Sequence, residues 1–162
     1  MNTETVLTEN MEDYLEMFYR IIEKQGYIRP VDLSAAVKVR PSSVTRMIQK
    51  LDEAGFISYK KYRNISLTDK GFRYGRFLVW RDEVLKEFLT LLKVEVGIAE
   101  QVEGIEHYIT PPTMAIIQKL LLYFLAKPDR LADLEAHQNR QLYPGNEELS
   151  NLRAWLFRHS NN

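Results

Sequence analysis

The chain has 162 residues, 45% of them hydrophobic, and equal numbers of acidic and basic side chains. It is long enough to bury a core as one domain or two small ones, and nothing in its composition suggests disorder. It contains no cysteine, which excludes disulfides and thiolate metal sites and leaves His, Asp and Glu as strong metal ligands. The longest apolar run, residues 120–126, is too short to span a membrane, and the acidic N-terminus lacks the apolar stretch of a signal peptide. We therefore expect a cytoplasmic location.

Residues 29–68 have the pattern of a winged helix-turn-helix. A short helix at residues 31–37 is followed by a polar turn and by a second helix, which Pro41 begins and Gly55 ends in a left-handed cap. The helical period of its apolar residues predicts one buried stripe, made of Val44, Met47, Ile48, Leu51 and Ala54. Beyond Gly55, two short strands are predicted around a turn at residues 63–64.

The polar residues of this unit predict contacts with DNA. The face opposite the buried stripe can donate hydrogen bonds to base edges or phosphates in the major groove, and a basic wing tip is typical of phosphate contacts. The candidate DNA-binding residues are Arg40, Ser42, Ser43, Thr45, Arg46, Gln49, Lys50, Lys60, Lys61 and Arg63. The alternative is a small, solvated helical hairpin that binds no partner, because a helix-turn-helix pattern alone does not distinguish the two. Charge favours DNA, because residues 38–81 hold 11 basic and 3 acidic side chains, whereas residues 82–110 hold 2 and 7.

Beyond the wing the chain is predicted to be helical to its end. Thr68 is the expected N-cap of a long helix over residues 69–92, whose expected core residues are Phe72, Phe77, Trp80, Leu85 and Phe88. Further helices are expected at residues 95–109, after Pro111-Pro112, at 130–140 beyond Pro128, and from 146 onward. The segment MAIIQKLLLYFLA is apolar nearly all round, so we expect a second copy of the chain to cover it through Leu120, Leu121, Phe124 and Leu125.

Two acidic segments contain candidate metal ligands. MEDYLEMFY places Asp13 and Glu16 on one face of the first helix, and VEGIEHY places Glu103, Glu106 and His107 on one face of a helical turn. Carboxylates with one imidazole form a hard-to-borderline ligand set, which suits Mn²⁺ or Fe²⁺ better than copper or structural zinc. The ordinary alternative is a pair of solvated acidic faces with a surface histidine.

The order of these features resembles the diphtheria-toxin-repressor family of metal-dependent bacterial repressors, and within it the short manganese regulators. The resemblance spans residues 10–137 and rests on MEDYLE, PSSVTRMIQKLD, YKKYRNISLTDKG, LVWRDEVLKEFL and VEGIEH. It implies a mainly α fold, in which an N-terminal winged helix-turn-helix with a small β-hairpin wing is joined by a long helix to an all-helical dimerisation domain. We expect a DNA-binding domain at residues 1–70, a metal-binding and dimerisation domain at 71–140, and a helical extension at 141–162.

The resemblance also implies where metal binds, between the two domains. The matched positions are Asp13, Glu16, Asp82, Glu103, Glu106 and His107. The manganese regulators have a metal-binding histidine after the arginine of the long helix, in a pattern similar to LVYRHELL, whereas this chain has Asp82 in LVWRDEVL. We expect metal to bind through the other five residues, with the oxygen at Asp82 favouring Mn²⁺ over Zn²⁺ or Co²⁺. The segment 138–162 has no counterpart in the resemblance.

The implied function is a metal-responsive repressor, which binds palindromic operator DNA as a homodimer and controls manganese uptake genes. Its cofactor would be Mn²⁺, or else Fe²⁺ or another divalent cation, which favours one closed arrangement of two acidic clusters. One alternative is a winged-helix regulator without metal dependence, which binds DNA constitutively or docks a protein. Another is a metal-dependent hydrolase, although the chain has no H-E-x-x-H motif and no phosphate-cradling loop, since Gly71 and Gly75 are isolated.

Overall fold

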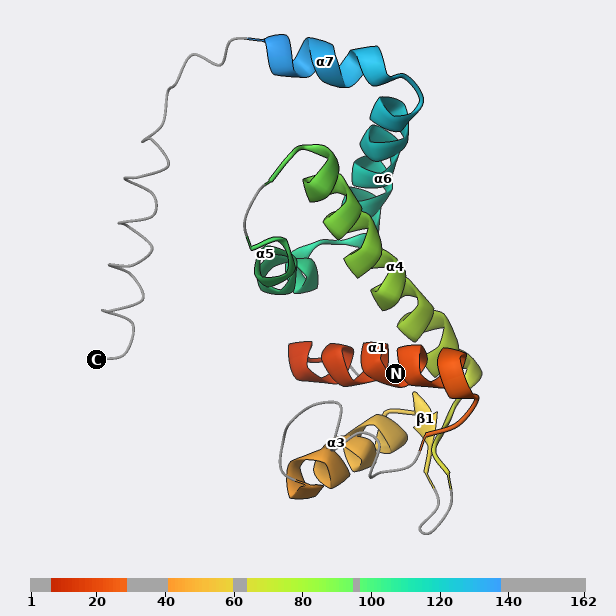
Figure 1. Ribbon diagram of the computed structural model, residues 1–162. Coiled ribbons are helices and arrows are strands. Elements are labelled where there is room, and N and C mark those ends of the chain that lie inside the picture. Colours follow the sequence, from red (N-terminus) through yellow and green to blue (C-terminus); the bar gives the residue numbers. More distant parts are fainter. Residues whose placement is uncertain (1–6, 29–40, 60–63, 95–96, 138–162) are drawn as a thin grey trace, which may run out of the picture. The chain divides into compact units, whose positions relative to one another are not determined.

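The computed structural model describes residues 7–28, 41–59, 64–94 and 97–137 (Figure 1). The helices expected at residues 31–37 and from 146, and the tip of the wing, lie outside these ranges. The chain divides into two compact units, Met1–Leu122 and Tyr123–Asn162, and each is considered by itself. No helix among the described residues has the length and apolar character needed to cross a membrane.

The described elements confirm a mainly helical fold with a small antiparallel sheet. They are α1 (Glu9–Gln25), α3 (Pro41–Glu53), β1 (Ile57–Ser58), β2 (Ser66–Leu67), α4 (Asp69–Leu91), α5 (Ile98–Ile105), the 3₁₀ helix η1 (Glu106–Tyr108), α6 (Pro111–Leu125) and α7 (Pro128–Ala136). In the sheet, Ile57 pairs with Leu67 and Ser58 with Ser66. The base of the predicted wing is thus present, on either side of a tip that is not described.

The first hydrophobic core joins α1, α3 and the sheet. Its largest fully buried side chains include Phe18 of α1 and Phe56 beside β1. The predicted stripe of α3 is confirmed, because Val44, Ile48 and Leu51 are buried while Met47 and Ala54 are half-buried at its margin. The cap after α3 is also confirmed: Gly55 has a φ of +75°, and the Phe56 N–H donates to the Leu51 carbonyl at 2.9 Å.

Helix α4 lies against α1 and the sheet through two glycines. A Cβ at Gly75 would lie 2.7 Å from the Cβ of Tyr19, and one at Gly71 would lie 1.7 Å from the carbonyl oxygen of Phe56. These glycines are therefore packing positions that admit no side chain. Phe72, expected in the core, is instead 44% exposed and rests on the Tyr19 ring, because the buried glycines occupy the side of α4 that faces the core.

The start of α4 is as the sequence predicts. Thr68 is its N-cap, and the side-chain oxygen of Thr68 accepts a hydrogen bond from the Gly71 N–H at 3.0 Å. A single cap of this kind satisfies one of the N–H groups that a helix leaves without an internal partner. The position of the long helix is therefore encoded locally in the sequence.

A smaller second core is formed by α4, α5 and α6. Its buried residues are Val84, Leu85, Val102, Met114 and Leu121. Leu121, expected at a contact surface, is thus buried within its own chain, whereas Leu120 and Leu125 are exposed as expected. The large apolar side chains that α6 leaves exposed are Ile116, Leu120, Leu122, Tyr123 and Leu125.

Two predicted helix boundaries are wrong. The segment expected as one helix over residues 95–109 is α5, which begins at Ile98 after the left-handed Gly97 and ends at Ile105, followed by η1. Of the three candidate ligands on this segment, Glu103 is exposed, Glu106 is buried and His107 is half-buried. The helix expected at residues 130–140 begins earlier, at Pro128, because proline is favoured in the first helical turn, and it ends at Ala136.

Candidate metal centre and DNA interface

Three of the candidate metal ligands meet between α1 and η1. One ligand atom from each of Asp13, Glu106 and His107 lies within 4.8 Å of the other two. The Nε2 atom of His107 is 3.3 Å from Oδ1 of Asp13. The Glu106 side chain is 3% exposed and the Asp13 side chain 36%, so the group is buried at one end and open to solvent at the other.

Glu12 holds the imidazole of His107 in one orientation. Its Oε2 atom lies 2.8 Å from Nδ1 of His107 and also accepts a hydrogen bond from Nη2 of Arg81 at 2.9 Å. A carboxylate only accepts hydrogen bonds, so Nδ1 is the protonated nitrogen of the neutral ring. The lone pair of Nε2 then faces Asp13, which is the arrangement that prepares a histidine to bind a metal ion.

The surroundings of these three residues shift the pKa of each. Burial raises the pKa of Glu106 to about 7, with a smaller lowering effect from Arg81. The pKa of Asp13 is raised by burial and by the nearby acidic residues, although His107 lowers it. Burial alone would lower the pKa of His107, but its hydrogen bond with Glu12 and the charge of Asp13 raise it.

Glu106 carries an unsatisfied oxygen. Among the described residues, Oε2 of Glu106 and Nε of Arg81 are buried without a hydrogen-bond partner and lie 3.8 Å apart. Buried polar atoms are usually paired, so an orphaned carboxylate oxygen needs a reason. Its place beside Asp13 and a correctly oriented imidazole fits the donor set of a divalent cation.

The other three candidate ligands lie in different surroundings. Glu103 is exposed, and its charge helps to raise the pKa of Asp13. Glu16 and Asp82 both bind Arg20, through Nε at 2.9 Å and Nη2 at 2.7 Å respectively. Burial alone would lower the pKa of Arg20, but the carboxylates of Glu16, Asp82 and Glu83 raise it, so Arg20 remains a cation. Of the six candidates, three therefore converge, namely Asp13, Glu106 and His107. Glu16 and Asp82 instead bind Arg20, and Glu103 is exposed.

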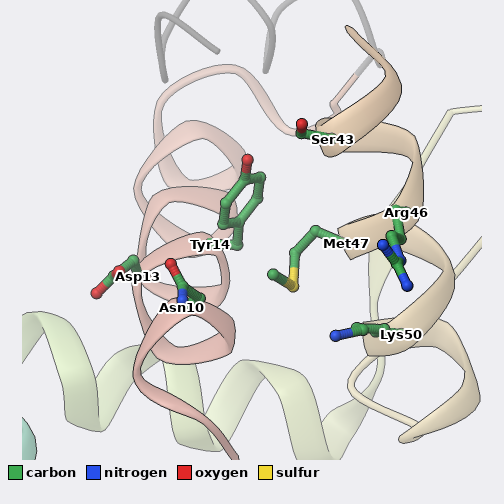
Figure 2. A pocket seen from close by; sticks show the side chains of 7 residues that line it. All are labelled: Asn10, Asp13, Tyr14, Ser43, Arg46, Met47 and Lys50. Atoms are coloured by element: carbon green, nitrogen blue, oxygen red, sulfur yellow. The ribbon is translucent and has the colours of Figure 1, made fainter. Parts of the chain in front are cut away.

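The polar face of α3 is open to solvent. Arg40, Lys60, Lys61 and Arg63 lie outside the described residues, and the remaining candidate DNA-binding residues are all exposed, namely Ser42, Ser43, Thr45, Arg46, Gln49 and Lys50. A cleft of about 490 Å³ between α1 and α3 is lined by Asn10, Asp13, Tyr14, Ser43, Arg46, Met47 and Lys50. Figure 2 shows Met47 and Lys50 extending towards α1, while Asp13 points away from α3. Helix α1 therefore lies between α3 and the candidate metal centre.

Comparison with known proteins identifies the family. Residues 6–65 match the profile of the iron dependent repressor N-terminal DNA binding domain, and residues 68–134 match that of the iron dependent repressor metal binding and dimerisation domain. The chain is also 43% identical over 141 residues to the HTH-type transcriptional regulator MntR of Shouchella clausii, a match that covers 86% of this chain and 99% of that protein. The chain belongs to the iron-dependent repressor family.

Solved structures of this family share the fold. A manganese-dependent transcriptional repressor in complex with manganese has a TM-score of 0.54 at 26% identity, over 68% of this chain and 52% of that one. IdeR from T. acidophilum has a TM-score of 0.56 at 24% identity, over 76% of this chain and 56% of that one, which supports the fold alone. The chain therefore spans about half the length of these solved chains.

Membership confirms the resemblance inferred from the sequence. The family consists of DNA-binding transcriptional repressors rather than enzymes, so the hydrolase alternative is excluded. Its second domain serves metal binding and dimerisation, which agrees with the expected partners, DNA and a second copy of the chain. Glu12 is the functional candidate that sequence reasoning missed, because it lies 95 residues from the histidine that it orients.

Proposed function

We propose that the chain is a Mn²⁺-responsive repressor, which acts in the cytoplasm, binds palindromic operator DNA as a homodimer and controls genes of manganese uptake. The observation that carries the proposal is the convergence of Asp13, Glu106 and His107 from two helices far apart in the sequence. Oxygen ligands with a single imidazole suit Mn²⁺ or Fe²⁺. One similar protein of known structure is a manganese-dependent transcriptional repressor by name, which favours Mn²⁺.

The ion would bind to Asp13, Nε2 of His107 and the unpaired oxygen of Glu106. Glu103 is a further carboxylate close enough to Asp13 to influence its pKa, and it would complete the ligand set from the solvent side. Glu12 does not belong to the ligand set; it is a positioning residue that fixes the tautomer of His107. Metal binding requires Glu106 to be deprotonated, and the ion would add positive charge beside its buried carboxylate.

Helix α1 would couple the ion to DNA. It packs on α3 within the first core, and it contributes Asp13 to the metal centre. An ion held by both Asp13 and η1 would fix the recognition helix relative to the second core. If only this arrangement places both recognition helices of a dimer one helical repeat apart, the preference of the metal for it becomes affinity for DNA.

On the DNA side, we assign the exposed face of α3 to the major groove. Ser43, Thr45, Arg46 and Gln49 would approach base edges, because their side chains offer donors along one solvent-exposed face. Arg40, Ser42, Lys50 and the wing residues Lys60, Lys61 and Arg63 would contact phosphates. We also propose domain boundaries at residues 70 and 140, the first supported by the meeting of the two family profiles between residues 65 and 68.

The test combines metal binding with DNA binding. An operator is first selected from random duplexes by the Mn²⁺-loaded protein, and its affinity is then measured by fluorescence anisotropy with Mn²⁺ or with chelator. The parent should bind Mn²⁺ saturably in calorimetry and bind the operator at least tenfold more tightly with the metal. Glu106→Gln should lose both effects, whereas Glu87→Gln, at an exposed position of α4, should retain them. Equal operator affinity with Mn²⁺ and chelator would instead identify a metal-independent regulator.

A further inference from the structure

Three neighbouring carboxylates, Glu16, Asp82 and Glu83, are already bound by two cations of the chain itself, Arg20 and Lys86. Arg20 contacts all three carboxylates, through Nε to Glu16 at 2.9 Å, Nη2 to Asp82 at 2.7 Å and Nη1 to Glu83 at 3.3 Å. Lys86 approaches Asp82 from the other side, with Nζ 2.6 Å from Oδ1. Both oxygens of Asp82 are therefore bound by side-chain cations, one from α1 and one from α4.

Charge and burial make this arrangement unfavourable for a metal ion. Three carboxylates carry a formal charge of −3, and Arg20 and Lys86 contribute +2. A divalent ion at Asp82 would lie within a few ångströms of both cations, and it would meet their repulsion. The Asp82 side chain is only 10% exposed, so water screens this repulsion less than it would at the surface.

The group formed by Asp13, Glu106 and His107 differs in this respect. The cation nearest to Glu106 is Arg81, and its guanidinium hydrogen-bonds to Glu12 rather than to Glu106. Oε2 of Glu106 consequently has no hydrogen-bond partner among the described residues. One group thus has a cation bound to each oxygen of Asp82, whereas in the other Arg81 Nε lies 3.8 Å from a buried Glu106 oxygen that has no hydrogen-bond partner among the described residues.

We propose that Arg20 and Lys86 keep a divalent ion from binding at Glu16 and Asp82, so that the six candidate ligands together bind one Mn²⁺ per chain. This inference rests on the proposed function for the identity of that one ion. The contacts of Arg20 also tie α1 to α4 without any metal. Metal control of the chain is then limited to the junction between α1 and η1, where Asp13 meets Glu106 and His107.

The stoichiometry of Mn²⁺ tests the inference. Native mass spectrometry and calorimetry with MnCl₂ on the full-length dimer should give one ion per chain. In Arg20→Gln/Lys86→Gln, Glu16 and Asp82 keep their carboxylates but lose their internal cations, so the count should rise to two. Lys24→Gln/Lys127→Gln changes the same charge at exposed positions that make none of these contacts and should leave the count at one.

Electron paramagnetic resonance of bound Mn²⁺ gives a second readout on the parent, which stays decisive should the double variant fail to fold. An isolated ion should give a resolved six-line spectrum, whereas two neighbouring ions should give a broadened, coupled one. Two ions per chain in the parent would overturn the inference and leave the proposed function intact. No saturable binding by the parent would overturn the proposed function itself. One ion in both the parent and the folded double variant would show that Arg20 and Lys86 do not exclude the second.

Discussion

The two hydrophobic cores of this chain differ in the surface that each leaves to solvent. In the first, α3 buries its apolar stripe and exposes only polar side chains on the opposite face. In the second, α6 buries Met114 and Leu121 but leaves other large apolar side chains exposed, among them Ile116 and Leu122. A polar, basic face suits nucleic acid, whereas an exposed apolar helix suits another protein surface. The contrast thus indicates that DNA binds at the exposed face of α3 and that a second copy of the chain binds at α6.

The largest effect should come from placing charge on α6. In Ile116→Glu/Leu120→Glu, two exposed side chains four residues apart on one helical face become acidic, and we expect the dimer to dissociate at micromolar concentration. Operator affinity should fall by about 10²-fold or more, because the two half-sites are no longer bound together. Sedimentation velocity and fluorescence anisotropy measure the two effects. Tyr27→Glu, at an exposed aromatic next to α1, should leave the dimer intact. A monomeric parent would show that the exposed apolar face of α6 does not hold two copies together.

A smaller effect is expected on the polar face of α3. Arg46→Ala should reduce affinity for the best operator by about 10- to 100-fold and erode discrimination against mismatched operators, since a base contact contributes about 1–3 kcal/mol. Lys60→Gln should instead weaken binding to all sequences alike and reduce the salt slope by roughly one unit. Anisotropy titrations on matched and mismatched duplexes at several salt concentrations separate the two. Unchanged affinity in both variants would remove the recognition-helix assignment.

The glycines of α4 and α5 should differ in how well each tolerates a side chain. Gly75→Ala places a methyl group 2.7 Å from the Cβ of Tyr19, so we expect a loss of about 1–3 kcal/mol in the free energy of unfolding. Gly104 of α5 has open space around it, so Gly104→Ala should leave stability unchanged or raise it by up to about 1 kcal/mol through helix propensity. Urea denaturation of both variants measures the difference. A neutral Gly75→Ala would show that α1 and α4 pack more loosely than described.

The smallest effect concerns pH and the metal centre. Burial raises the pKa of Glu106 to about 7 from its model-compound value of 4.5, and the pKa of His107 is also raised. The folded metal-free protein therefore holds more protons than the unfolded chain between about pH 4.5 and 7, and its stability should decline as pH rises through this window. Mn²⁺ competes with these protons, so metal affinity should increase from pH 6 to pH 8.

Thermal unfolding with and without Mn²⁺ checks both parts. The melting temperature of the metal-free protein should be higher at pH 6 than at pH 8, while the increase caused by Mn²⁺ should be larger at pH 8. Glu106→Gln cannot titrate at this position and should flatten the first dependence. A Mn²⁺ affinity that is constant from pH 6 to pH 8 would contradict the assignment of Glu106 as a buried ligand.

Local features of the fold were predictable from sequence. Pro41, Gly55 and Thr68 act on the backbone within a few residues, so each helix boundary that they set agrees with the structure. The buried stripe of α3 follows from helical periodicity alone. By contrast, the role of Gly75 depends on Tyr19, which is 56 positions away in the sequence, and no local pattern distinguishes it from an ordinary helical glycine.

The candidate metal centre was predictable in its residue types but not in its arrangement. Spacing placed Glu103 with Glu106 and His107 on one helical face, but it did not indicate that a 3₁₀ helix begins at Glu106, or that Glu106 is buried while Glu103 is exposed. The pairing of Glu12 with His107, and that of Arg20 with Asp82, join segments 95 and 62 residues apart. Such pairings depend on how α1 meets α4 and η1, which sequence periodicity does not describe.

The two faces of α3 have a consequence for how such a protein diversifies. Val44, Ile48 and Leu51 are committed to the core, whereas Ser42, Thr45 and Gln49 are exposed. Substitutions at exposed positions usually change stability by less than about 0.5 kcal/mol. Single substitutions at these exposed positions can therefore change which operator sequence is bound, while the fold and the metal centre stay the same.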